Sequence, residues 1–162
     1  NIKSLWSDNS GLPNTEKYLK ATVTTEVETV VTVVDTYYDL LGTYTVDSES
    51  HISMDSNGVF KVLSGSGGYR VAGAFTIQGT ANDVLDIRVV KSTDGGTTFP
   101  IVVNHLSRVV NNLSGGRDVA FFNLDFLAQL NENDLIKLQI ENKTGTGNVT
   151  AELDSYVLII GI

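Results

Sequence analysis

Apolar and polar residues alternate along short runs of this chain, and turn-forming residues separate the runs. The runs are rich in Val, Thr, Ile, Tyr and Phe, whereas Gly, Asn, Asp and Ser lie between them. Alternation with a period of two is typical of strands that bury one face, and no stretch shows the 3.6-residue period of an amphipathic helix. The pattern therefore predicts an all-β protein.

The predicted strands follow one another through most of the chain. Residues 18–34 are predicted as one long strand or a strand pair, and the strongest turn signal is Asp94-Gly95-Gly96. Eight or more strands with this spacing favour a two-sheet antiparallel jelly-roll sandwich. The other predicted strands are residues 40–46, 51–54, 58–63, 69–78, 84–91, 101–110, 119–130, 135–142 and 148–161.

Two segments carry apolar residues on both faces of a predicted strand, although a strand of an isolated sandwich needs only one apolar face. In residues 119–127 the even positions form a core face, yet Val119 and Phe121 lie on the other side. In residues 148–162 the odd positions form the predicted core face: Val149, Ala151, Leu153, Val157 and Ile159. The even positions form a second apolar stripe: Tyr156, Leu158, Ile160 and Ile162.

An uncovered stripe of this kind would be an aggregation hazard on a single chain. Identical subunits are the favoured cover, because two separate strands carry the excess and closed symmetric oligomers are common. A loop or the N-terminal segment of the same chain is the alternative. The predicted subunit interface consists of Phe121, Tyr156, Leu158, Ile160 and Ile162.

The first twenty residues include several large apolar side chains, but these do not recur with the period of a strand or a helix. They begin at Asn1 rather than Met and combine Ile2, Leu5, Trp6 and Leu12 with polar residues. An extended arm and a disordered terminus are both open interpretations. The predicted domain organisation is an arm or linker over residues 1–20 and a jelly-roll head over residues 21–162.

Composition narrows the classes of function. The 162 residues fit one domain, with 41% hydrophobic residues and a net charge of −8. The 11 basic residues are scattered, which argues against nucleic acid and anionic membranes as partners, and no apolar run is long enough to span a bilayer. The absence of cysteine excludes disulfides and thiol chemistry.

Three segments resemble the tumour necrosis factor and complement-head jelly-roll superfamily. They are Leu130-Asn-Glu-Asn-Asp-Leu-Ile-Lys-Leu-Gln-Ile140, the terminal Tyr156-Val-Leu-Ile-Ile-Gly-Ile162, and Gly68-Tyr-Arg-Val-Ala-Gly-Ala-Phe75. The resemblance implies a homotrimer, because the last strand of these heads carries aromatic and aliphatic residues to the trimer axis. Asn133 stands where the superfamily often has Gly, which is tolerable because Asn adopts the left-handed conformation.

The sequence of residues 40–162 is most similar to bacteriophage structural proteins that have this type of jelly-roll head. The Asn142-Lys-Thr-Gly-Thr-Gly-Asn-Val-Thr150 stretch before the last strand carries that resemblance. It implies a virion protein, either a capsid decoration protein or a fibre head. The arm at residues 1–20 lies outside the resemblance.

Signals for catalysis or ligand binding are weak, and no catalytic, cofactor or metal-binding residue is predicted. His51 and His105 fit no hydrolase pattern, and Gly65-Ser66-Gly67 is neither a nucleophile elbow nor a phosphate cradle. Four carboxylates could meet at one rim and hold calcium, although solvated surface charge is the favoured interpretation: Asp83, Asp86, Asp94 and Asp118.

Two further motifs concern the surface. Sequons at Asn112, Asn142 and Asn148 would be surface glycosylation sites in a eukaryotic secretory route. Tyr37 and Tyr38 could form an exposed pair that stacks on sugars, although aromatic pairs in β proteins more often serve packing.

The favoured hypothesis is a non-enzymatic virion protein, a homotrimeric jelly roll on the capsid surface or at a fibre head of a bacteriophage. Ile2, Leu5 and Trp6 would attach it to the major capsid protein or another virion protein. The alternative is a receptor- or carbohydrate-binding head that grips a host-surface glycan or protein with its loops. A hydrolase built around His105 or a carboxylate pair is the least favoured class.

Overall fold

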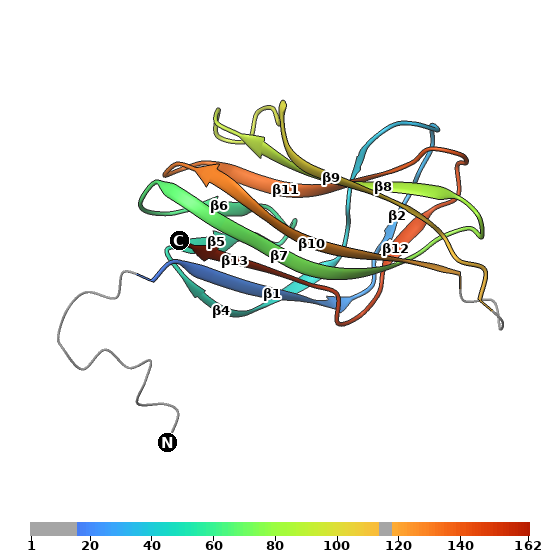
Figure 1. Cartoon of the computed structure of the whole chain (residues 1–162), viewed down its shortest axis with the longest axis horizontal. Helices are drawn as coiled ribbons and strands as arrows, with labels where there is room; N and C mark the ends of the chain where they lie inside the picture. Colours follow the sequence, from blue (N-terminus) through green and yellow to red (C-terminus); the bar gives the residue numbers. More distant parts are fainter. Residues whose placement is uncertain (1–15, 114–117) are drawn as a thin grey trace, which may run out of the picture.

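Two antiparallel β-sheets packed face to face make up the fold (Figure 1). The computed structural model describes residues 16–113 and 118–162, which form strands and connecting turns. In this part of the chain no helix is long and apolar enough to cross a membrane. The predicted attachment residues Ile2, Leu5 and Trp6 lie outside the described residues.

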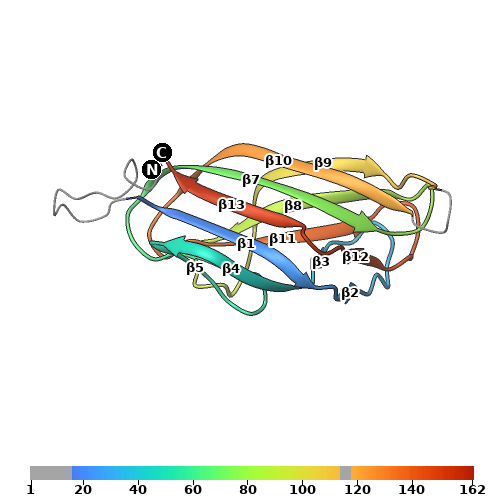
Figure 2. The same ribbon diagram turned by 90° about the horizontal axis from the view of Figure 1, so that it is seen from below.

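The first sheet has seven strands, and β7 (Gly67–Gln78) is its central member. β10 pairs with the whole length of β7 along one edge, while β12 and β13 share the other edge. Figure 2 shows β10, β7, β13, β1 and β4 side by side. The remaining strands of this sheet are β2 (Glu28–Thr29), β12 (Val149–Ala151), β13 (Tyr156–Gly161), β1 (Tyr18–Thr25), β4 (Thr43–Ser50) and β10 (Val119–Leu130).

The second sheet has six strands, and β11 (Leu135–Asn142) is its central member. β8 pairs with all of β11 on one edge, and β6 and β3 pair with separate parts of it. The other strands are β3 (Tyr38–Asp39), β5 (Ile52–Met54), β6 (Phe60–Val62), β8 (Val84–Ser92) and β9 (Ile101–Val109). The predicted all-β, two-sheet antiparallel sandwich is confirmed.

The core lies between the sheets and is built from alternate residues of each strand. In β7 the inward positions include Tyr69 and Phe75, both fully buried, and β10 contributes Phe122. Ile87 and Ile140 close the core from the second sheet. Each such side chain contributes about 1.5–3 kcal/mol through burial. The alternation holds one face of each sheet against the core and leaves the other face outward.

The predicted strand over residues 148–161 is wrong in one respect, because a turn divides it into β12 and β13. Both parts run along the same edge of β7. Between them, Asp154 has a positive φ of 65°, and Leu153 is 53% exposed rather than in the core. Asp adopts this left-handed conformation more readily than most residues, so the turn forms without glycine.

Two further predictions need correction. Val119, predicted on the outer face of its strand, is buried, and a bridge to Asn111 pairs its backbone. Residues 18–34 do not form one long strand or an adjacent pair. β1 ends at Thr25 and pairs with β13 and β4, whereas the short β2 pairs with β12.

Candidate subunit interface

The outer side of the first sheet brings together the apolar side chains that alternation directs away from the core. Ile160 on β13 lies opposite Arg70 of β7 on one side and Tyr18 of β1 on the other. One step along the strand, Leu158 lies opposite Ala72. Because the side chain of Ala72 is small, the larger side chains beside it protrude from the surface of the sheet.

The structure places all five predicted interface residues on this outer side. Phe121 on β10 is 53% exposed, and Ile162, directly after β13, is 79% exposed. Tyr156 and Ile160 are exposed to 36% and 39%, and Leu158 is half-buried. Tyr156, Leu158 and Ile160 lie along one strand, whereas Phe121 lies two strands away, across β7.

Two members of this surface were not predicted from the sequence. Leu127 on β10 is the most exposed of them, at 71%, and Tyr18 begins β1 beside Ile160. The signal was present for Leu127, which has the same odd parity as Phe121 along β10. We call the set the outer apolar face: Tyr18, Phe121, Leu127, Tyr156, Leu158, Ile160 and Ile162.

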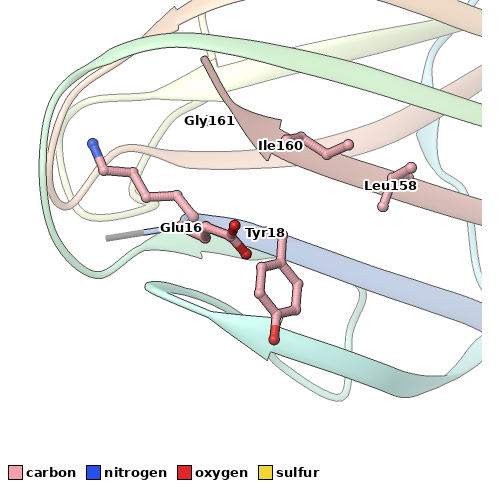
Figure 3. A pocket seen from close by; sticks show the side chains of 6 residues that line it. Glu16, Tyr18, Leu158, Ile160 and Gly161 are labelled. Atoms are coloured by element: carbon pink, nitrogen blue, oxygen red, sulfur yellow. The ribbon is translucent and has the colours of Figure 1, made fainter. Parts of the chain in front are cut away.

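A cavity of ≈ 450 Å³ lies on the outer apolar face where β1 begins and β13 ends. Figure 3 shows Leu158 and Ile160 along β13 with Tyr18 on the adjacent strand. Glu16 and Lys17 form its polar rim. The face is therefore hollowed at this end rather than flat, which suits insertion of a side chain from a packing partner.

An ion pair between Arg70 and Asp125 interrupts the outer apolar face. Arg70 donates from Nε to Oδ1 of Asp125 at 2.8 Å and from Nη2 to Oδ2 at 2.9 Å. The hydrogen bonds and charge of Arg70 lower the pKa of Asp125, and those of Asp125 raise the pKa of Arg70. Both partners belong to the outward positions of β7 and β10.

The two histidines lie far apart: His51 lies between β4 and β5, and His105 lies on β9 of the second sheet. Ser64 Oγ and His51 Nδ1 lie 2.6 Å apart, a contact that sequence spacing did not predict. The backbone N–H of Leu63 also donates to the His51 carbonyl at 2.9 Å. These bonds tie Leu63 and Ser64 to His51, the residue directly before β5. His105 lies on β9 opposite Arg88, far along the chain and the sheet from that contact.

The four carboxylates considered for calcium do not share a rim. Asp83 precedes β8 and bonds with Asn142, whereas Asp94 follows β8 at its opposite end. Asp86 accepts from Ser107 and pairs with Lys143, and Asp118 accepts from the Leu113 backbone. Among the described residues there is no group of three His, Cys, Asp or Glu side chains that could hold a metal ion.

The predicted surface motifs are largely occupied by internal contacts. The Arg88 guanidinium lies 3.6 Å from the centre of the Tyr37 ring, and Tyr38 Oη accepts from the Val33 backbone at 2.9 Å. Arg88 thus covers one face of the Tyr37 ring, and the half-buried Tyr38 packs against the hydrophobic core. Asn142 is fully buried, so its sequon is not a surface site, in contrast to the exposed Asn112 and Asn148.

Comparison with solved structures identifies the class of fold. The Eiger TNF structure from S. frugiperda superposes with a TM-score of 0.66 at 10% identity, over 91% of this chain and 92% of that one. Murine APRIL at pH 5.0 superposes with a TM-score of 0.62 at 8% identity, over 91% and 99% of the two chains. The chain therefore has a jelly roll of the tumour necrosis factor type.

No protein-family model matches the sequence, and no curated protein matches it. At 10% identity or less, the structural likeness establishes the fold and not the activity. The predicted tumour necrosis factor-like jelly roll is confirmed.

Proposed function

We propose that this chain is a non-enzymatic head module that assembles as a homotrimer through the outer apolar face. The single observation that carries the proposal is the exposure of large apolar side chains on the same side of two strands. They are Tyr156 and Ile160 on β13, and Phe121 and Leu127 on β10. Apolar patches of this kind on soluble proteins mark sites of protein association. The threefold arrangement is what the resemblance of the last strand implies.

Cover by the same chain is the competing explanation for the outer apolar face. In the part of the chain that the structure describes, the side chains of Phe121, Leu127, Ile160 and Ile162 remain at least 39% exposed. No described loop therefore covers them. A second copy of the same face supplies large apolar side chains and the cavity beside Tyr18, and that combination supports association between copies.

The place of this head in a virion is the second part of the proposal. The similarity of residues 142–150 to bacteriophage structural proteins supports a capsid decoration or fibre-head role. Residues 1–15, with Ile2, Leu5 and Trp6, would attach the head to the major capsid protein or another virion protein. The negative net charge of −8 would keep a particle coated with such heads soluble.

Multi-angle light scattering tests the assembly directly. We expect the wild-type protein to have three times the 17.5 kDa mass of the chain. Ile160→Asp is expected to lower the mass to that of one chain, or to produce aggregates, because a charge buried at the interface without a partner is costly. A matched control is Leu63→Asp, because Leu63 is exposed to 47% beyond β6 of the second sheet. The control is expected to remain trimeric, and a wild-type monomer would overturn the proposed function.

A further inference from the structure

The ion pair between Arg70 and Asp125 lies inside the outer apolar face. Leu127 lies directly opposite Arg70 on one side, and Ile160 lies opposite it on the other. Leu158 and Asp125 both lie opposite Ala72, on its two sides. The two charges are therefore bordered by large apolar side chains along both neighbouring strands.

The charges on this part of the sheet are paired: on β1, Lys20 lies opposite Leu158 and its Nζ lies 3.3 Å from Asp47 Oδ2. On β7, β10 and β13, all within the described residues, the outward positions hold only Arg70 and Asp125 as charged groups. This part of the surface is thus neutral on a chain whose net charge is −8. Two copies can approach through it without the mutual repulsion that the acidic remainder of the surface produces.

Covering the outer apolar face would change the energetics of this pair. In the single chain its side chains are 53% and 61% exposed, and ion pairs exposed to water contribute little to stability. Once water is excluded, each charge and each unused hydrogen-bonding group needs a partner. Asp125 accepts hydrogen bonds from two of the five N–H donors of the Arg70 guanidinium. The remaining donors then need acceptors on the covering molecule.

We propose that the Arg70–Asp125 pair determines the specificity of self-association, and that its partner is a second copy of this chain. The inference rests on the proposed function, since it concerns the same face. A second copy brings polar outward side chains of its own β10, Asn123 and Gln129, next to the same apolar residues. Only a restricted set of orientations satisfies both the apolar contacts and the charged pair, so the pair selects one stoichiometry.

The first test removes the negative charge without changing the shape of the side chain. Asp125→Asn leaves the Arg70 guanidinium in the covered face without its carboxylate, and we expect association at least 30-fold weaker by analytical ultracentrifugation. The matched control is Asp39→Asn, which breaks the 2.7 Å pair with Lys137 on the outer side of the second sheet. The control is expected to associate like the wild type. Association of Asp125→Asn within tenfold of the wild type would overturn the inference.

The second test separates specificity from affinity. The double variant Arg70→Met with Asp125→Leu replaces the pair with apolar side chains of similar size, which is often neutral or stabilising for a buried pair. We expect association at least as tight as that of the wild type, but as a mixture of stoichiometries. A single trimeric species, or weaker association, would overturn the inference and leave the proposed function intact. A monomeric wild type, in contrast, would overturn both.

Discussion

Single polar side chains fix the turns at the ends of this sandwich, and Asp94 is the clearest case. Its carboxylate accepts hydrogen bonds from Ser92 Oγ at 2.6 Å, from the Thr98 backbone at 3.0 Å and from Thr98 Oγ1 at 2.7 Å. These bonds stabilise the ionised form and hold the pKa of Asp94 well below its usual range. The turn between β8 and β9 is therefore coupled to the charge of this carboxylate.

We expect Asp94→Ala to lower the Tm at pH 7 and to lose that effect in acid. Because the pKa is lower in the folded state, the stabilisation is fully present above the ordinary value of 3.8 and disappears as the pH falls through the lowered pKa. Thermal unfolding of the wild type and Asp94→Ala from pH 7 to pH 2 measures this. A difference in Tm that grows as the pH falls would contradict the assignment.

Gly73 permits the close approach of β7 and β13. A Cβ at this position would lie 2.6 Å from the Tyr156 carbonyl oxygen, too close for any side chain. Gly73→Ala is therefore expected to displace β13 and lower the free energy of unfolding by about 1–3 kcal/mol. Urea unfolding measures the effect, with Gly42→Ala as the control because its nearest neighbour would lie at an ordinary 3.5 Å. Equal losses in both variants would contradict this explanation.

At the scale of elements, adjacent residues of β10 serve opposite surfaces. Phe122 is fully buried, whereas Phe121 points outward at 53% exposure. Phe122→Ala is expected to lower the free energy of unfolding by about 3–5 kcal/mol through loss of core packing. Phe121→Ala should leave the stability of the dissociated chain within about 0.5 kcal/mol and weaken association instead. Urea unfolding at low protein concentration, together with sedimentation, distinguishes the two, and equal effects on stability would contradict the assignment.

The long regular strands could be predicted from the sequence, because each has one consistently apolar face. Residues 119–130 and 135–142 were predicted with the bounds that β10 and β11 have. The turn at Asp154 was missed, because Leu153 continues the apolar odd positions before it and Val157 resumes them after Ser155. The Arg70–Asp125 pair was missed for another reason. Its partners are 55 positions apart, and only the pairing register of β7 with β10 brings them together.

At the scale of the whole molecule, we propose that the head mediates assembly and that residues 1–15 mediate attachment. Deleting residues 1–15 is therefore expected to leave the fold and the trimer intact while abolishing binding to capsids. Circular dichroism and light scattering check the head, and cosedimentation with capsids that lack the protein checks attachment. Loss of the fold would instead show that this segment contributes to the core, and retained binding to capsids would contradict its role in attachment.

The first and last strands lie side by side, and the Gly161 backbone N–H donates to the Lys17 carbonyl at 2.7 Å. The described chain therefore begins and ends at the same end of the sandwich, and the loops at the other end point away from both. A short linker from residue 162 back to residue 16 should accordingly permit circular permutation, with new ends opened at Gly95. Peptides grafted at the far loops would then be displayed outward in several copies on one assembly.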